Sequence, residues 1–148
     1  MARQIPLIDN ERVTGFIDLA LERAFVYRPG QPSQQIDLPE DVAALEAEAR
    51  FHMLEQLADY DDSLMEQLLS DLTPDRDAVF ADLVSDLNQG LIVPVFFGSA
   101  LNGFGVRRLL KALRHETPPI DQAALRLGLD GPSAYVFKPS SAGHAGEL

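Results

Sequence analysis

The strongest hydrophobic signal in the chain is a short apolar run that stops at small residues. The run is Ile92-Val93-Pro94-Val95-Phe96-Phe97, and Gly98-Ser99-Ala100 follows it at once. A run rich in β-branched and aromatic residues that ends at glycine predicts a buried strand leading into a loop. Beyond the loop, apolar residues return at helical spacing, at Val106, Leu109, Leu110 and Leu113. Strand, loop and helix in this order are half of an α/β unit.

Upstream, the pattern predicts four short extended segments, at residues 4–8, 13–19, 24–27 and 35–37. Polar residues 9–12 form a turn between the first two segments. Residues 28–33 contain two prolines and a glycine, so they form a loop rather than a strand. Because Pro6 has no backbone N–H, the first segment is expected at a sheet edge or at a strand start.

Three helices are predicted between residues 38 and 90. The first opens at Leu38-Pro39 and runs to about Tyr60, with an apolar face of Val42, Leu45, Ala49, Met53 and Leu57. The second runs from Leu64 to Leu72 after the capping residues 61–63. The third begins with Thr73 as N-cap and Pro74 in the first helical position, and it ends at Gly90. Its buried side is expected to be Ala78, Val79, Leu83 and Leu87.

The composition of the chain indicates where the protein is found in the cell and how its charges are distributed. The 148 residues include no cysteine, no apolar run approaches the roughly 20 residues of a membrane helix, and the first residues lack a signal peptide's apolar core. We therefore expect a soluble, cytoplasmic protein without a membrane partner. The net charge is −11, and residues 37–86 carry fifteen acidic side chains against only Arg50 and Arg76. Such a segment repels nucleic acid, so we expect its partner to be a basic protein. We expect no sequence-specific binding of nucleic acid.

Three groups of residues form a pattern that spans most of the chain. One group is Gly98-Ser99-Ala100 with Gly105-Val106 and Leu109-Leu110; another is Pro6-Leu7, Gly15-Phe16-Ile17-Asp18-Leu19 and Phe25-Val26-Tyr27; the third is Asp61-Asp62-Ser63-Leu64-Met65-Glu66, followed later by Thr117-Pro118-Pro119. Together they resemble elongation factor G, a family of translational GTPases. The chain departs from the family at Val13, where phenylalanine is usual, and at Asn102-Gly103-Phe104, where Lys-Asn-Lys is more common.

The resemblance implies an α/β fold class and a domain plan. Residues 1–90 would be the inserted α+β subdomain of the GTPase domain, and residues 91–119 the last strand, guanine-binding loop and helix of that domain. Residues 120–148 would be a linker with a helical turn, then the truncated start of a second, β-barrel domain, with a strand at 133–138 and a hairpin turn after it. The chain would thus be an internal fragment of a longer parent protein.

The resemblance also assigns a nucleotide contact to the loop after the apolar run. In the family this loop meets the guanine base with backbone amides, so Ser99 and Ala100 would contact or shape the base pocket and Leu101 would flank it. Small side chains suit such an approach, and loops at the carboxyl ends of strands are common ligand sites. Gly98 to Gly103 also imitates a phosphate loop, but Phe104 stands where the phosphate-binding lysine belongs.

The motifs that perform phosphoryl transfer do not occur in this sequence: there is no G-x-x-x-x-G-K-[ST], no Asp-x-x-Gly and no Asn-Lys-x-Asp. GTP or GDP with Mg is therefore expected in the parent protein, whereas the fragment alone is expected to bind no cofactor tightly and to be inactive. No catalytic residue is assigned in it. No His, Asp or Glu grouping has metal-ligand spacing, so no metal site is assigned either.

A second candidate site is an acidic face on the first long helix, formed by Asp41, Glu48, His52, Glu55 and Asp59. Such a face can simply be solvated. The resemblance implies instead that it meets the C-terminal domain of the ribosomal stalk protein. The basic stripe Arg107, Lys111 and Arg114 leaves the same two alternatives open, a solvated helix face or a contact with ribosomal RNA.

The implied function of the parent is GTP-dependent movement of transfer and messenger RNA through the ribosome. Two alternatives remain. One is a paralogue of the same GTPase family, such as a release-factor recycling or ribosomal protection protein. The other is a standalone acidic protein-binding module without nucleotide chemistry, which GTP binding by the natural full-length product would rule out.

Overall fold

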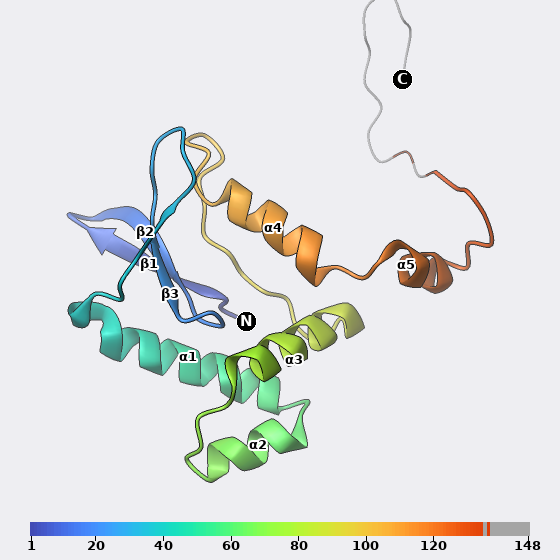
Figure 1. Ribbon diagram of the computed structural model, residues 1–148, viewed down its shortest axis with the longest axis horizontal. Helices are drawn as coiled ribbons and strands as arrows, with labels where there is room; N and C mark the ends of the chain where they lie inside the picture. The colour runs from blue at the N-terminus through green and yellow to red at the C-terminus, as the bar shows by residue number, and fades with distance from the viewer. Residues whose placement is uncertain (135, 137–148) are drawn as a thin grey trace, which may run out of the picture. The chain divides into compact units, whose positions relative to one another are not determined.

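The computed structural model describes residues 1–134 and residue 136 (Figure 1). The chain divides into two compact units, and the division falls between Thr117 and Pro118. The strand predicted at 133–138 includes residues outside the described part, and the hairpin turn at 139–148 lies wholly outside it. The domain boundaries expected after residues 90 and 119 stay predictions.

The first four elements form an antiparallel sheet in the order β1-β2-β3-β4. The strands are Gln4–Asp9, Arg12–Asp18, Arg23–Val26 and Gln34–Ile36. All four extended segments predicted from the sequence are confirmed, and Pro6 lies in the edge strand β1 as expected. Asp9 pairs with Arg12 across a two-residue turn, in which Asn10 and Glu11 have φ of 48° and 62°. Positive φ at both central residues gives the turn the twist that a tight hairpin needs.

Gly15 of β2 has a steric reason to be glycine. A Cβ added there would lie 2.0 Å from the backbone oxygen of Phe25 on the neighbouring strand β3. The next residue, Phe16, is buried and stacks on Phe25 with ring centroids 5.1 Å apart. The Gly-x-x-Asp-Leu pattern therefore begins with a close approach of two strands, where any side chain would separate them.

Three α-helices follow the sheet: α1 (Ala43–Ala58), α2 (Asp62–Leu69) and α3 (Arg76–Gln89). The predicted opening of the first helix is instead a 3-10 turn, η1, over Glu40–Val42. Asp61 caps α2 by accepting from the amides of Ser63 and Leu64. The N-cap predicted at Thr73 is wrong, because Asp75 caps α3 with its carboxylate and Pro74 precedes the helix. Gly90, with φ of 76°, ends α3 as predicted.

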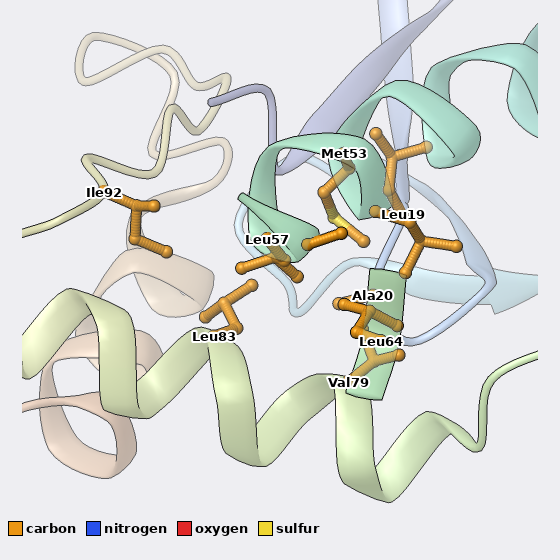
Figure 2. Packing of buried hydrophobic residues seen from close by; sticks show 10 residues of the cluster. Leu19, Ala20, Met53, Leu57, Leu64, Val79, Leu83 and Ile92 are labelled. Atoms are coloured by element: carbon orange, nitrogen blue, oxygen red, sulfur yellow. The ribbon is translucent and has the colours of Figure 1, made fainter. Parts of the chain in front are cut away.

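The main core lies where these helices meet the end of β2. Figure 2 shows Met53 and Leu57 of α1, Leu64 of α2, and Val79 and Leu83 of α3 converging on Leu19 and Ala20. The predicted apolar face of α1 is wrong at Leu45, which is 53% exposed, and that of α3 is wrong at Ala78, which is exposed. On α1 the buried stripe is rotated by one residue: it is Glu46, Arg50, Met53, Leu54, Leu57 and Ala58.

Arg50 explains that rotation. Its guanidinium donates to the backbone oxygen of Leu19 and pairs with Glu22 at 2.7 Å. An arginine stem can pack against apolar neighbours while its charged head is paired, so Arg50 takes a place that a periodicity argument gives to an aliphatic residue.

The apolar run at residues 92–97 is not the regular buried strand that the sequence predicts. It is extended, and it meets the N-terminal residues through a single parallel bridge between Ala2 and Val95. Ile92 is buried, but Val93 is 74% and Val95 50% exposed. Within the described residues only one edge of this segment has a backbone partner, and that partner contributes a single bridge, so no regular ladder forms.

The predicted helix after the loop is confirmed as α4 (Val106–Glu116). Its apolar residues Val106, Leu109, Leu110 and Leu113 are 39–59% exposed, and only Ala112 and Glu116 are buried. The second unit, described by itself, contains α5 (Ile120–Leu127), which ends at Gly128 with φ of 66°. Among the described helices none is long and apolar enough to cross a membrane.

Candidate functional site

Residues 98–105 form a compact turn whose two limbs are hydrogen-bonded to each other. The amide of Ser99 donates to the Phe104 oxygen at 2.9 Å, and the amide of Phe104 donates back to the Ser99 oxygen at 3.0 Å. At the tip, the Gly103 amide donates to Ala100 at 3.2 Å. The Asn102 side chain donates to Ser99 Oγ at 3.0 Å. The turn is therefore held by its own backbone and by one side-chain pair.

Two glycines let the limbs of this turn approach each other. A Cβ on Gly98 would lie 2.8 Å from the Phe104 oxygen. A Cβ on Gly105 would lie 2.6 Å from the Phe97 oxygen, and Gly105 also has φ of 75°, a conformation that L side chains rarely adopt. The spacing from Gly98 to Gly105 is thus a steric requirement of this loop.

The three residues predicted to contact guanine differ in what they can offer. The Ser99 amide is used inside the turn, and Ser99 Oγ fixes Asn102. In the described part of the chain, the amides of Ala100 and Leu101 donate to no protein acceptor, and the Leu101 side chain is 96% exposed. Beside them is a depression of about 170 Å³ that Phe96, Ser99, Ala100, Phe104 and Leu109 help to line. Two adjacent amides on a rigid turn can serve a ligand oxygen, with Ser99 shaping the turn.

The loop is attached to the sheet through the side chains of Gln4 and Tyr27, and the sequence predicted neither contact. Gln4 Oε1 accepts from the Phe97 amide at 3.0 Å. The Tyr27 hydroxyl donates to the Phe97 oxygen at 3.2 Å, and the Tyr27 ring stacks on Phe104 with centroids 4.8 Å apart and planes 1° apart. Burial raises the pKa of the Tyr27 phenol above its usual value, so the hydroxyl stays a donor across neutral pH.

Below the loop, four charged side chains form a buried ion cluster: Arg3, Asp18, Arg108 and Glu116. Arg108 contacts Asp18 Oδ2 through Nη2 at 2.6 Å and Nε at 3.0 Å. Arg3, fully buried, lies 3.5 Å from Asp18 and 3.7 Å from Glu116. Burial lowers the pKa of Arg3, an effect that the charges of Asp18 and Glu116 oppose. The cluster joins the N-terminal segment, the end of β2 and both ends of α4.

This ion cluster links α4 to the N-terminal segment and to the end of β2, and the helix itself buries only Ala112 and Glu116. Two cations and two anions balance, which a buried group of charges requires. The cluster was not predicted from the sequence, and no role was assigned to Arg108. The available signal was Asp18, an acid that directly follows an apolar strand in the Gly-x-x-Asp-Leu pattern.

The acidic face is a separate surface. Glu48, His52 and Glu55 are exposed on α1, exposed Asp59 is its C-cap, and His52 Nδ1 lies 2.9 Å from Glu55 Oε2. Asp41 is exposed as well, but it lies in η1 before the α-helix begins. The structure therefore places three of the five predicted residues on one helix and a fourth, Asp59, at its C-cap.

The acidic face also borders apolar grooves that the sequence did not predict. One groove of about 220 Å³ is lined by Phe51, Glu55, Asp59, Met65, Leu68 and Leu69. A second, of about 300 Å³, is also lined by Phe51 and reaches Leu72 and Pro74. Phe51 is 48% and Leu69 80% exposed. Acids beside exposed apolar side chains form a surface that a basic protein with an apolar contact could cover.

On α4 the three cations of the predicted basic stripe, Arg107, Lys111 and Arg114, are exposed. No His, Cys, Asp or Glu group of three or more in the described residues is arranged to hold a metal ion.

Comparison with known proteins shows which proteins this chain is related to. No protein-family model matches the chain. An elongation factor G-like protein of Synechocystis is 42% identical over 136 residues, which cover 90% of this chain and 20% of that protein. Elongation factor G of Rhodopirellula baltica is 32% identical over 122 residues, which cover 80% of this chain and 17% of that protein. A crystal structure of a protein from Thermus thermophilus has a TM-score of 0.75 and 25% identity, and the match covers 99% of this chain and 22% of that one.

The chain spans about a fifth of the length of the curated relatives it matches. The match to the solved structure agrees with the mixed α/β architecture, an antiparallel four-stranded sheet followed by helices. The resemblance noted in the sequence is thereby confirmed: this chain is homologous to one part of elongation factor G and elongation factor G-like proteins, which act in translation.

Proposed function

We propose that this chain contributes the guanine-contacting loop and a stalk-docking face to an elongation factor G-like GTPase. In this proposal residues 1–90 are the inserted subdomain, residues 91–119 the end of the GTPase domain, and residues 120–148 the start of the second domain. The whole protein would use GTP to move transfer and messenger RNA through the ribosome. The observation that carries the proposal is the turn between Gly98 and Gly105, which presents the amides of Ala100 and Leu101.

The chemistry of the base explains why two backbone amides suffice for selection. Guanine carries a carbonyl oxygen, O6, at the position where adenine carries an amino group. An N–H from Ala100 or Leu101 can donate to O6, whereas the adenine amino group would place donor against donor. If the bound base shields such an amide from water and offers it no acceptor, the cost is about 1–3 kcal/mol, enough to discriminate between the bases.

The same loop gives no means of holding phosphate. Phe104 occupies the place of a phosphate-binding lysine, and the turn uses the Ser99 and Phe104 amides internally. GTP, GDP and Mg would therefore depend on parts of the whole protein beyond these residues. We expect the isolated chain to recognise the base weakly and to hydrolyse no GTP.

The acidic face would dock the C-terminal domain of the ribosomal stalk protein. Support comes from the exposed acids on α1 and from the apolar groove that Glu55 and Asp59 border. Opposite charge chiefly speeds encounter, and the adjacent apolar side chains would retain the partner. The stalk and the ribosome are thus the proposed macromolecular partners.

Two other assignments stay open to test. A release-factor recycling or ribosomal protection paralogue would keep the guanine contact, and only its ribosomal task would differ. A standalone acidic module would lack base recognition altogether.

Saturation-transfer NMR with guanosine and adenosine on the 148-residue chain tests the proposal. We expect transfer to guanosine that is several-fold stronger than to adenosine. Gly105→Ala should abolish the difference because its methyl group collides with the Phe97 oxygen. Gly30→Ala is the matched control, since Gly30 has φ of 66° but lies in open space. Equal transfer to both nucleosides in the unmodified chain would refute the guanine assignment.

A further inference from the structure

Tyr27 contacts both limbs of the loop at residues 97–105. Its hydroxyl donates to the Phe97 oxygen on the entering limb, and its ring stacks on Phe104 on the leaving limb. These two residues are seven positions apart in the sequence, and Tyr27 is some seventy positions from either. Neither contact is part of the proposed base recognition, which uses the turn's outer amides.

Tyr27 is itself held by the sheet. Its amide donates to the Thr14 oxygen of β2 at 2.8 Å, immediately after β3 ends. Its ring lies 5.7 Å from that of buried Phe16, which in turn stacks on Phe25. An unbroken series of aromatic contacts therefore runs from the sheet to the loop, and Tyr27 is its last member on the sheet side.

We propose that Tyr27 is a positioning residue that fixes the guanine-contacting loop to the inserted sheet. The contacts set the separation of the two limbs and the position of the turn that they carry. The geometric part of the inference stands on these contacts alone, and only its consequence for nucleotide recognition rests on the proposed function. On this account the amides of Ala100 and Leu101 are placed by a residue far upstream in the chain, directly after β3.

Few other contacts could do the same task. Gln4 holds only the entering limb, through the Phe97 amide. The bonds between Ser99 and Phe104 join the limbs to each other and leave their position relative to the sheet free. Asn102 and Ser99 act at the tip. Arg108 ties the following helix α4 to Asp18 of β2, whereas Tyr27 contacts the leaving limb itself through Phe104.

The experiment is native-state amide hydrogen exchange on the full 148-residue chain, read by NMR at Ser99 and Phe104. The variants are Tyr27→Leu, which removes ring and hydroxyl, and Tyr27→Phe, which removes the hydroxyl alone. Tyr60→Leu is the matched control, because Tyr60 is 52% exposed at the end of α1. The amide of buried Leu19, which donates to the backbone oxygen of Arg3, reports on the stability of the sheet and helices.

We expect Tyr27→Leu to accelerate exchange at Ser99 and Phe104 about tenfold or more relative to Leu19, since a stacked aromatic pair and a hydrogen bond are lost together. Tyr27→Phe should restore most of the protection, and Tyr60→Leu should change nothing. Unchanged exchange at Ser99 and Phe104 in Tyr27→Leu would overturn the proposal. Equal acceleration at Leu19 would overturn it too, because Tyr27 would then stabilise the whole unit without positioning the loop.

Phe104→Leu provides the same test from the loop side if Tyr27→Leu does not fold. It removes the ring partner from an exposed turn, and it should also accelerate exchange at Ser99 but not at Leu19. Guanosine titration separates this inference from the proposed function. If the unmodified chain ignores guanosine, base recognition is refuted while the exchange result still decides the role of Tyr27. If guanosine binds, Tyr27→Leu should weaken it several-fold and Tyr27→Phe should recover it.

Discussion

Replacing Arg108 by alanine is the sharpest test of what holds α4 to the rest of its unit. Asp18 is fully buried and receives two charge-assisted contacts from Arg108, at 2.6 and 3.0 Å. Removing one partner of a buried ion pair costs about 3–5 kcal/mol, because the other charge stays behind unpaired. Asp18 would keep Arg3 at 3.5 Å and the Leu21 amide at 3.1 Å. We therefore expect a loss at the lower end, about 3 kcal/mol.

A loss of that size is large for a small domain, whose total stability is about 5–15 kcal/mol. With an m-value of about 2 kcal/mol per molar urea, the unfolding midpoint should fall by about 1.5 M. Urea titration followed by circular dichroism measures this shift. Arg107→Ala is the matched control, because Arg107 is the exposed neighbour on the same helix and should leave the midpoint within experimental error.

The double variant Asp18→Asn with Arg108→Ala completes the test. It removes both charges, so its destabilisation should be clearly smaller than the sum of the two single losses. An Arg108→Ala midpoint equal to that of Arg107→Ala would refute the reasoning. The ion cluster would then be an incidental arrangement, and α4 would be held by other contacts.

Three further predictions concern the loop, the pH response and the acidic face. Gly105→Ala should destabilise the chain by about 1–3 kcal/mol through strain and collision, and more than Gly30→Ala, as calorimetry can check. Burial and the charge of Asp61 raise the pKa of Asp86 above its ordinary value of 3.8. Between the two pKa values the folded carboxyl keeps a proton that the unfolded chain releases, so the free energy of unfolding falls as the pH rises through this range. Asp86→Asn should therefore stabilise the protein in urea titrations at pH 7 and give little gain at pH 3; an equal gain at both would contradict the assignment. Changing the acidic-face residues Glu48, Glu55 and Asp59 to lysine should slow association with the stalk protein about tenfold or more, as measured by stopped flow at low salt. Changing three exposed acids elsewhere, Asp9, Glu11 and Asp37, to lysine should not slow it.

Local signals in the sequence predicted the sheet and the helices well. The short extended segments, the polar turn at residues 9–12 and the loop at 28–33 predict all four strands, because strand ends depend on nearby turn residues. The cap at Asp61 and the stop at Gly90 were predicted for the same reason. The misplaced N-cap at Thr73 is a local error, because two capping residues flank one proline and only the geometry decides between them.

Distant partners account for what the sequence did not predict. Nothing in the order of residues says that Arg108 rather than Arg107 turns inward, since its partner Asp18 is 90 positions away. Arg50 occupies a buried position because Leu19 and Glu22 satisfy its guanidinium. The apolar run at 92–97 was predicted to be buried, but burial of a strand's side chains needs elements packed on both of its faces. Tyr27 was noticed only as an aromatic residue at a strand end, and its contact with the loop depends on tertiary structure.

The central claim is that the amides at the tip of the loop read O6 of guanine, and amide chemical shifts on addition of nucleosides test it most directly. Guanosine, inosine and adenosine should be added in turn to the ¹⁵N-labelled chain. Inosine keeps the O6 carbonyl and lacks only the guanine 2-amino group, so it separates recognition of O6 from recognition of the amino group. We predict that guanosine and inosine shift the Ala100 and Leu101 amides, whereas adenosine leaves them in place. Equal shifts with adenosine, or shifts confined to other residues, would contradict the account.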